Sequence, residues 1–486
     1  MKRINRFFTA GLLCAVCSGA AYSDNLVILH TNDTHSQIDP NDKGLGGILR
    51  RKVLVDSVRA VEPNVLLVDA GDAVQGTLYF TLYGGEVERK MMNELGYDIQ
   101  ILGNHEFDNG VESLAEQWKN VKADKITTNY DVRGTALEGV FKPYTVKRFG
   151  DKRVGFIGIN LDPQGMIAHD KSTGVVYLDG IKAANSMAWY LKNVEHADLV
   201  VAVTHVGYST ENPPTPSDID LARASEDIDI IIGGHSHTLI DPEATSAPEH
   251  RIPNASGDSV LVVQTGSRGV NLGLIDIDLD SKRSDYRLIA VDSRLDGRID
   301  PVAAAVLEPY RAGVDSLMNV KIGRMAQEMP QSGDLLLNWV ADIMCRMGED
   351  FSNRPVDLAI VNKGGIRRGL PKGDITKGMI MTMLPFDNRL VVMDIKGEDL
   401  AEGFKVMEHR GGDGVSAGFD YRNIDPGRTY RLVTIDYLAN GGDYMEPLTH
   451  GVVVAKSPLR LDETLMDYLE KNKKKTIKYR DDSPRM

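Results

Sequence analysis

The chain has 486 residues, which is too long for one ordinary hydrophobic core and predicts two domains. Its hydrophobic fraction of 42% and charged fraction of 26% are typical of a globular protein. The formal net charge of -13 argues against a protein that binds nucleic acid, because such proteins need a concentrated basic surface. An anionic small molecule would need local positive charge, which bound metal ions can supply.

The N-terminus has the pattern of an export signal. Lys2, Arg3 and Arg6 precede an apolar run from Phe7 to Ala21, and we expect cleavage after Ser23. The run is too short to cross a bilayer as a helix, and no later segment has the required apolar length. We therefore expect an exported protein, periplasmic or extracellular, with no membrane span.

The cysteines argue against a lipid anchor and against disulfides. Cys14 and Cys17 lie inside the signal, and neither follows the small residue of a lipid-attachment site, so simple cleavage is favoured over lipoprotein anchoring. Cys345 would be the one cysteine left after cleavage, so no intramolecular disulfide is expected. Its neighbours have a helical pattern, which predicts a buried, unreactive thiol.

In chain order, the first part alternates short apolar runs with helical patterns at 46–61, 85–95, 111–119 and 181–193. Apolar runs without polar alternation are typical of strands buried on both faces. Five runs are followed by Asp, Asn or His, so these side chains should converge at the carboxyl ends of the strands. The runs are 25–30, 64–69, 99–102, 198–205 and 228–232.

The pattern changes after residue 260. Alternating strands are predicted at 261–265 and 272–279, and a charge-rich stretch at 280–300 precedes a helical pattern at 301–317. The last part has helical patterns at 335–346 and 461–471 and strand patterns at 357–361 and 430–437. We expect a signal peptide at 1–23, a first domain at 24–296, a linker helix at 297–319 and a second domain at 320–486.

The most polar of the connecting stretches runs from Gly103 to Gly110. Asn104 offers a neutral carbonyl oxygen, His105 a nitrogen that exchanges a proton near neutral pH, and Asp108 a carboxylate that can orient the imidazole. One segment can therefore supply a metal ligand and a general acid.

The candidate metal ligands combine oxygen and imidazole donors without a thiolate, a set that suits Zn, Mn, Fe or Mg. Seven protein ligands exceed what one ion with an open position can use, so two divalent ions roughly 3.5–4 Å apart are expected. Asp72 is the candidate bridge between them. The seven ligands are Asp33, His35, Asp72, Asn104, His205, His235 and His237.

AspXHis, GlyAsp, GlyAsnHisGlu, ThrHis and GlyGlyHisSerHis occur here in the order seen in the calcineurin-type metallophosphoesterases. With AsnXGlyGlyIleArg, LeuProPheXAsn and AlaAsnGlyGlyAsp downstream, the chain resembles the exported 5′-nucleotidase and UDP-sugar hydrolase family over essentially its whole mature length. The resemblance implies a four-layer α/β/β/α sandwich, followed by a smaller α/β domain that binds the substrate.

The resemblance also implies roles for individual residues. One metal would be held by Asp33, His35, Asp72 and His237, and the other by Asp72, Asn104, His205 and His235. His105 and Asp108 would form the catalytic pair. Substrate would be held by the second-domain residues Asn362, Arg367, Asn388 and Tyr444.

The chain departs from the family at two places. The family carries further arginines at the start of the helix that begins SerGlyAspLeuLeuLeuAsn here, and Lys363 or Arg368 would have to replace them. The stretch expected to hold one base-stacking aromatic is shortened to residues 411–418, and Tyr444 stands where the second is expected. Phe419 is assigned to the core.

Three functions compete. The first is a two-metal phosphohydrolase acting on nucleoside 5′-monophosphates, with nucleotide sugars as further substrates. The second uses the same chemistry as a 2′,3′-cyclic nucleotide phosphodiesterase with 3′-nucleotidase activity. The third is a non-catalytic nucleotide-binding surface protein, against which the presence of His105 and Asp108 argues. The oligomeric state cannot be read from the sequence.

Overall fold

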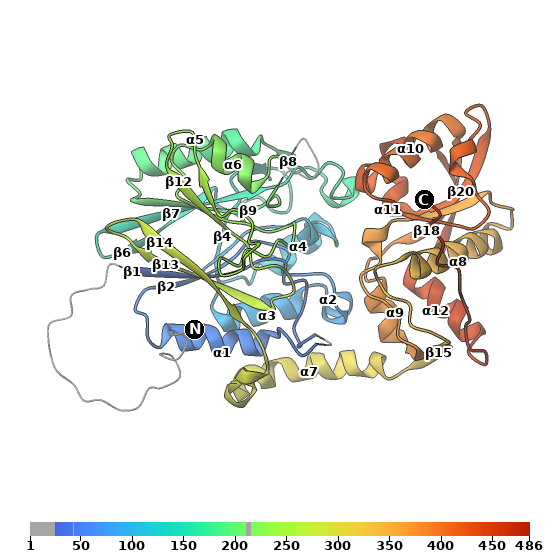
Figure 1. Ribbon diagram of the computed structural model, residues 1–486, viewed down its shortest axis with the longest axis horizontal. Coiled ribbons are helices and arrows are strands. Elements are labelled where there is room, and N and C mark those ends of the chain that lie inside the picture. The colour runs from blue at the N-terminus through green and yellow to red at the C-terminus, as the bar shows by residue number, and fades with distance from the viewer. Residues whose placement is uncertain (1–24, 42, 210–214) are drawn as a thin grey trace.

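The computed structural model describes residues 25–41, 43–209 and 215–486, so the expected signal peptide lies outside the described residues. The chain forms two bodies side by side, and helix α7 (Pro301–Met318) runs along the first body and connects it to the second (Figure 1). The predicted helix at 301–317 is confirmed. Asp300 caps it through Val302 N, and Pro301 occupies its first turn, where a missing N–H costs nothing.

Two six-stranded sheets form the centre of the first body. The order of the first is β14-β13-β1-β2-β3-β4. Strands β1 to β4 are parallel to one another, and β13 is antiparallel to both of its neighbours, β1 and β14. Its strands are β1 (Asn25–Thr31), β2 (Val65–Asp69), β3 (Ile99–Gln100), β4 (Asp124–Lys125), β13 (Asn271–Asp278) and β14 (Arg283–Ala290).

The order of the second sheet is β11-β12-β10-β9-β7-β6. Its four central strands are parallel, and β6 and β11 are antiparallel edges. The strands are β6 (Tyr144–Phe149), β7 (Lys152–Asn160), β9 (Leu199–His205), β10 (Ile230–Ile232), β11 (Arg251–Pro253) and β12 (Ser259–Val263). A small separate ribbon pairs β5 (Tyr130–Asp131) with β8 (Val176–Tyr177).

The buried side chains show four layers. One apolar cluster joins the two sheets and includes Ile28 and Val68 of the first sheet and Phe156 and Val201 of the second. Separate clusters fill the outer face of each sheet beneath its helices. Strands buried on both faces explain the continuous apolar runs of the sequence. The predicted α/β/β/α sandwich is therefore confirmed.

The helices cover the outer faces of the sheets. Figure 1 shows α5 and α6 over the second sheet and α1 and α3 beneath the first. The helices are α1 (Ile48–Arg59), α2 (Leu78–Tyr83), α3 (Glu86–Leu95), α4 (Val111–Trp118), α5 (Gly180–Asn193) and α6 (Asp218–Ala224), with 3₁₀ turns η2 (His105–Phe107), η3 (His169–Lys171) and η4 (Ser293–Arg298). The charge-rich stretch at 280–300 is not merely a connection, since it contains β14 and η4.

The second body has its own core around a five-stranded sheet of order β19-β16-β20-β18-β21. The strands are β15 (Lys321–Met325), β16 (Leu358–Val361), β17 (Gly373–Thr376), β18 (Arg389–Lys396), β19 (Gly414–Val415), β20 (Thr429–Ile435) and β21 (Val452–Arg460). The helices are α8 (Asp334–Ser352), α9 (Lys377–Met383), α10 (Gly397–His409), α11 (Asp436–Ala439) and α12 (Leu461–Lys471), with 3₁₀ turns η5 (Lys363–Gly365), η6 (Tyr421–Asn423), η7 (Gly442–Tyr444) and η8 (Glu446–His450).

Phe419 packs against this second core, as expected. Cys345 lies in α8, as its helical neighbours predicted, but it is half-buried rather than buried. Among the described residues, no helix is both long enough and apolar enough to span a membrane.

Candidate metal centre and substrate cleft

The polar residues that follow the five apolar runs lie together at one edge of the sandwich. Strands β1, β2 and β3 of one sheet and β9 and β10 of the other all lead to this edge. Three groups have ligand atoms that all lie within 4.8 Å of one another. They are Asp33 with His35 and His237, His35 with Asp72 and His105, and Asp72 with His205 and His235.

Close contacts connect the groups. The Nε2 atoms of His35 and His237 are 2.8 Å apart, and Asn104 Oδ1 is 3.0 Å from His235 Nδ1. His205 Nε2 is 3.2 Å from Asp72 Oδ2. The structure therefore brings all seven predicted ligands into one cluster. Asp72 belongs to two of the groups, as a bridging carboxylate requires.

The backbone at these positions is strained. Asp33, His35, Asp72, His235 and His237 have φ values of 49°, 46°, 53°, 78° and 55°, in the left-handed region that residues other than glycine rarely adopt. Such strain persists only where the surroundings over-determine it, and it concentrates at functional sites. The conformations aim these side chains at a common point.

Glycines let the loops approach one another. A Cβ on Gly103 would lie 2.2 Å from Asp72 Oδ1, and one on Gly71 would lie 2.7 Å from Gly103 N. Any side chain there would displace the neighbouring loop. This explains why the GlyAsp and GlyAsnHis motifs need their glycines.

The cluster fits divalent cations. Nδ1 of His35 is buried and makes no hydrogen bond within the described residues, and Nε2 of His205 faces the Asp72 carboxylate at 3.2 Å. Burial lowers the pKa of His235 to about 3 and that of His237 to about 4, so both imidazoles are neutral and carry the lone pair that a metal needs. Oxygen and imidazole donors without thiolate suit Zn, Mn, Fe or Mg.

Glu106 supports the cluster from beneath. Its carboxylate accepts backbone N–H groups from Asp72 (3.0 Å), Ala73 (3.1 Å) and Gly103 (2.7 Å), and its Oε1 is 2.8 Å from Arg89 Nη2. Glu106 is 2% exposed, so this is a buried carboxylate with all its bonds inside the protein. It joins the loop after β2 to the loop after β3. The GlyAsnHisGlu motif contained this residue, but nothing in its spacing revealed the role.

His105 lies between the cluster and the second body. Its Nδ1 is 3.0 Å from Asp108 Oδ2, and its Nε2 is 3.3 Å from Arg367 Nη2. Burial opposes charge on the ring, but the Asp108 and Asp72 carboxylates outweigh it and raise the pKa of His105. The pairing of His105 with Asp108 matches the expected geometry.

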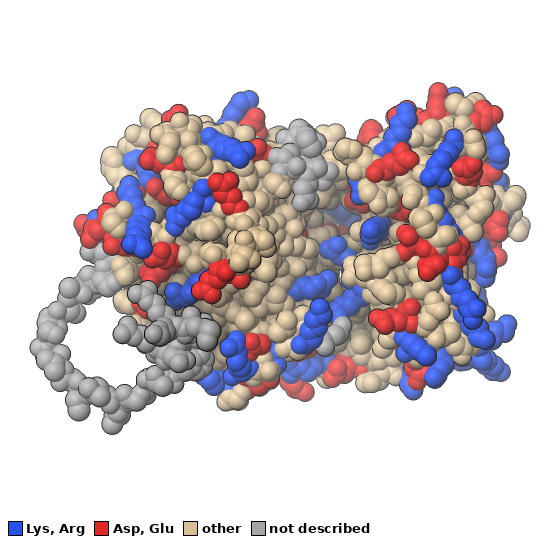
Figure 2. Space-filling model, viewed as in Figure 1, with Lys and Arg blue, Asp and Glu red and all other residues tan. Residues whose placement is uncertain are grey.

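A cleft of about 740 Å³ separates the two bodies. The first body lines it with Asp72, Asn104, His105, Asp108, His235 and His237, and the second with Asn362, Arg367, Phe386, Asn388, Tyr437 and Asp443, among others. Figure 2 shows basic side chains along the boundary between the bodies on the face in view, although the chain as a whole is acidic.

Arg367 links the two sides of the cleft. Besides approaching His105, its Nη2 donates to Gln75 Oε1 of the first body at 3.3 Å. Its guanidinium carbon lies 5.6 Å from the centre of the Phe386 ring. The neighbouring Arg368 reaches Gln37 Oε1 at 3.5 Å. The loop that begins at Asn362 therefore faces the candidate metal centre.

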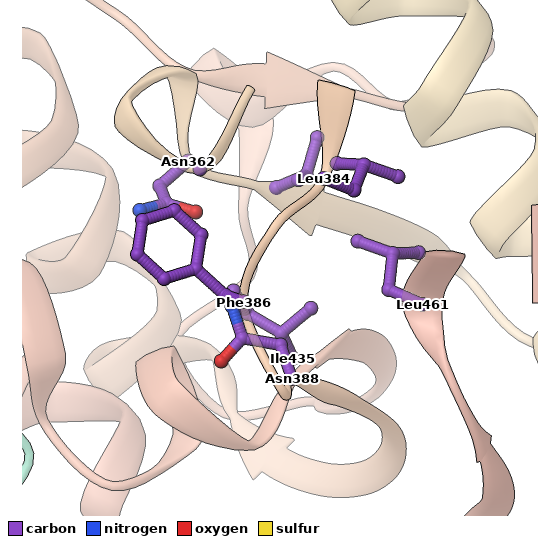
Figure 3. A pocket seen from close by; sticks show the side chains of 8 residues that line it. Asn362, Leu384, Phe386, Asn388, Ile435 and Leu461 are labelled. Atoms are coloured by element: carbon purple, nitrogen blue, oxygen red, sulfur yellow. The ribbon is translucent and has the colours of Figure 1, made fainter. Parts of the chain in front are cut away.

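The other two predicted substrate residues differ in position. Asn388 lines the cleft and a small cavity beside Asn362 and Phe386 (Figure 3). Tyr444 does not contribute to the cleft lining; its ring packs on Gly165 of the first body, where an added Cβ would lie 2.4 Å from Tyr444 Cδ1.

The structure places other aromatic rings in the cleft wall of the second body. Phe386, from the LeuProPheXAsn motif, and Tyr437, at the start of α11, both line it. The sequence did not predict either ring in this role, because the resemblance places the base-stacking aromatics at 411–418 and at Tyr444. Phe386 belongs to the LeuProPheXAsn motif, so an aromatic residue within a substrate-domain motif was the signal that could have identified it.

Comparisons with known proteins agree with this geometry. The calcineurin-like phosphoesterase family matches residues 26–239, and the 5′-nucleotidase C-terminal domain family matches residues 317–419. A two-sheet sandwich with a polar cluster of this composition at its edge defines the first body as a metallophosphoesterase, a metal-dependent phosphoric ester hydrolase.

Relatives extend the match over both bodies. The 5′-nucleotidase of Bos taurus is 28% identical over 91% of this chain and 82% of its own length. Protein UshA of Yersinia enterocolitica is 27% identical over 92% of this chain and 91% of its own length. A solved structure, the 5′-nucleotidase precursor of Thermus thermophilus, superposes with a TM-score of 0.80 at 29% identity and covers 94% of this chain and 97% of that one. The chain therefore combines a calcineurin-like phosphoesterase domain with a 5′-nucleotidase C-terminal domain and is similar to 5′-nucleotidases over both bodies.

Proposed function

We propose that this protein is an exported two-metal phosphohydrolase that releases phosphate from nucleoside 5′-monophosphates and also accepts nucleotide sugars. The supporting observation is that Arg367 of the second body comes within 3.3 Å of His105 beside the candidate metal cluster. A small generic ester would need only the first body. The second body, on the other side of the cleft, provides a surface for the rest of a nucleotide.

We assign two divalent cations, Zn, Mn, Mg or Fe, to the cluster. Asp33, His35, Asp72 and His237 would hold one, and Asp72, Asn104, His205 and His235 the other. When bound, such a pair supplies a water-derived nucleophile at neutral pH and stabilises charge on the phosphoryl oxygens.

The remaining chemistry belongs to His105 and Asp108. Asp108 accepts from Nδ1 and so orients the ring, which leaves Nε2 facing the cleft. From there His105 can stabilise the transition state and help the leaving alkoxide depart. His105 is therefore the proposed catalytic residue, and Asp108 orients it.

In the second body, Arg367 is assigned to the part of the nucleotide beyond the reacting phosphoryl group, where its guanidinium can donate two hydrogen bonds to oxygen acceptors. Asn362, Asn388 and Tyr444 remain predicted substrate residues. Phe386 and Tyr437 add aromatic faces on which a nucleobase can stack. This assignment would place recognition of the base on different residues from those the sequence suggested.

The proposal keeps the expected organisation. The signal would occupy residues 1–23, the first domain 24–296, the linker helix 297–319 and the second domain 320–486. A substrate panel tests the function. Metal-stripped protein, refilled with single metals, is assayed for phosphate release from nucleoside 5′-monophosphates, UDP-sugars, 2′,3′-cyclic nucleotides and 3′-nucleotides.

We expect the 5′-monophosphates to be the best substrates, with activity only after metal is restored. Preference for the cyclic and 3′-nucleotides would select the alternative phosphodiesterase. Tight nucleotide binding without phosphate release under any metal would select the non-catalytic binding protein.

A further inference from the structure

Arg410 follows helix α10 and joins two aspartates of the second body. Its Nη1 donates to the backbone oxygen of Asp443 at 2.7 Å and lies 3.0 Å from Asp443 Oδ2. Its Nη2 donates to Asp413 Oδ2. The Arg410 side chain is 17% exposed, and the side chains of Asp413 and Asp443 are 5% and 24% exposed, so the three charges lie largely out of solvent.

Each aspartate holds one point of the loop Asn362–Arg367, which we call the substrate loop. Asp413 Oδ1 accepts from the backbone N–H of Lys363 at 2.8 Å. Asp443 Oδ2 accepts from Asn362 Nδ2 at 2.7 Å. Arg410 is therefore connected to the start of the substrate loop by two separate routes.

The two carboxylates need the cation between them. Burial raises the pKa of Asp413 and the charge of Asp443 adds to that effect, whereas the Arg410 guanidinium opposes both. Asp443 has a φ of 54°, a strained conformation for a non-glycine residue, and Tyr437 Oη also donates to its Oδ1 at 2.8 Å. Without Arg410, two like charges would remain close together with too few partners.

The first residue of the loop packs against its middle, and the backbone N–H of Gly365 donates to Asn362 O at 3.1 Å. Asn362 is 5% exposed, and its Oδ1 comes so close to Gly365 that a Cβ there would lie 2.6 Å from it. Figure 3 shows the Asn362 amide beside the Phe386 ring. Arg367, two residues after Gly365, then reaches His105 across the cleft. The backbone N–H of Arg367 also donates to Met383 O at 2.8 Å, so the loop is held at both ends and Arg410 acts on its first end.

We propose that Arg410 is a positioning residue for nucleotide binding. It holds Asp413 and Asp443 in the geometry that fixes the substrate loop, and through that loop it sets the position of Arg367. This inference rests on the proposed function, because the effect assigned to Arg410 is on the binding of a nucleotide. It also gives the shortened stretch 411–418 a structural role, since Asp413 lies within it.

The test compares Arg410→Met, Arg410→Lys and the control Arg428→Met. Arg428 pairs with Asp357 on the surface of the same domain, away from the contacts that hold the substrate loop. Each protein, with its metals restored, is assayed on a nucleoside 5′-monophosphate and on p-nitrophenyl phosphate. Hydrogen exchange of the 362–368 backbone is measured in parallel.

For Arg410→Met we expect KM for the nucleotide to rise roughly tenfold while kcat changes less than about threefold. The kcat/KM for p-nitrophenyl phosphate should fall by less than about threefold, because the small ester leaves the nucleotide surface unused. Amide exchange at Lys363 should accelerate. Arg410→Lys should recover part of the loss, since one ammonium keeps the charge but cannot reproduce the guanidinium fork.

Equal losses on both substrates, or a loss also seen in Arg428→Met, would mean that Arg410 supports the domain in general, and would overturn the proposal. Unchanged exchange at Lys363 would overturn it as well. If Arg410→Met does not fold, Arg410→Lys and Asp413→Asn are tested in the same way. If the wild type releases no phosphate from any nucleotide, the proposed function fails, while the exchange measurement still decides whether Arg410 fixes the loop.

Discussion

The first body forms one wall of the cleft, which we call the first wall, and the second body forms the second wall. A charged side chain holds the loops of each wall, and the two charges have opposite signs. In the first body an anion, Glu106, gathers three backbone N–H groups and so ties together two loops of the metal cluster. In the second body a cation, Arg410, lies between two aspartates that hold the substrate loop. Glu106 bonds the loop backbone itself, whereas Arg410 reaches the substrate loop only through the two aspartates, one of which accepts from the backbone N–H of Lys363.

The difference follows from what each wall has to hold. Metal ligands must converge with strained backbone conformations, and a backbone-bonded carboxylate at 2% exposure gives little freedom. The substrate loop would have to admit and release a larger molecule. The partly exposed cluster of Arg410, Asp413 and Asp443 restrains it less tightly. Substitutions in the first wall should therefore cost more activity than those in the second.

The largest effect is expected from Asp72→Asn, at the shared point of the cluster. A neutral amide bridges two cations poorly, so hydrolysis should be nearly abolished and bound metal should fall below two per chain. Elemental analysis and turnover check this. Asp56→Asn, on the surface of α1, is the matched control. Two bound metals with normal turnover would remove Asp72 from the bridging position.

The next effect is expected from His105→Ala, which should keep both metals and lose roughly 10²–10⁴ in rate, the usual size of a lost acid or electrostatic helper. Metal content and kcat are measured together. His450→Ala, an exposed histidine paired with Asp399, serves as control. A parallel fall of metal content and activity would make His105 a ligand instead.

A smaller effect should follow from Glu106→Gln, which tests the support of the first wall. The amide group would point an N–H at backbone donors, so metal affinity should fall by roughly 10–100-fold, as for other residues that orient metal ligands. Arg89 would keep its hydrogen bond to Gln100 but lose its anionic partner, at a cost on the order of 3 kcal/mol in the free energy of unfolding. Metal titration and thermal unfolding measure the two effects.

Arg89→Met separates these effects. It removes the ion pair but leaves the carboxylate its three backbone donors, so metal affinity should change much less than in Glu106→Gln. Equal metal affinities for Glu106→Gln and wild type would show that the loops hold their positions without this carboxylate.

The smallest effect on the chemistry is expected from Arg367→Ala in the second wall. KM for nucleotides should rise by roughly tenfold or more, while p-nitrophenyl phosphate hydrolysis changes little, because the lost contacts are to the part of the nucleotide that the small ester lacks. Parallel kinetics on both substrates check it. Equal losses on both, or none on the nucleotide, would exclude Arg367 from substrate binding and remove the contrast between the walls.

The first wall could be predicted from the sequence because its information is local. Each ligand follows an apolar run within a few residues, as Asp33 follows β1 and His205 ends β9, and parallel strands bring such positions to one edge. The strand and helix patterns identified the layers for the same reason. The prediction was weaker at 280–300, where a polar strand, β14, at the edge of the first sheet has no buried run to mark it.

The second wall was predicted only in part, because motif resemblance named Asn362, Arg367 and Asn388, which line the cleft, but not its aromatic rings. Tyr444 was selected because it follows AlaAsnGlyGlyAsp, yet its ring packs on Gly165, while Tyr437 lines the cleft. Arg410 and Glu106 carried no signal because their partners are up to 34 residues away in the chain and, for Glu106, are backbone atoms.

The sequence by itself determined the fold class and the phosphoesterase resemblance, and it predicted the residues of the candidate metal cluster, because period, motif order and donor chemistry are properties of short segments. Only the tertiary structure decided which residues face one another across the cleft. Arg367 meets His105 at 3.3 Å, and Glu106 and Arg410 come to hold the loops around them, only when the two bodies pack together and each core closes. Contacts between distant segments depend on how helices and strands pack together, and the sequence of one segment does not specify that packing.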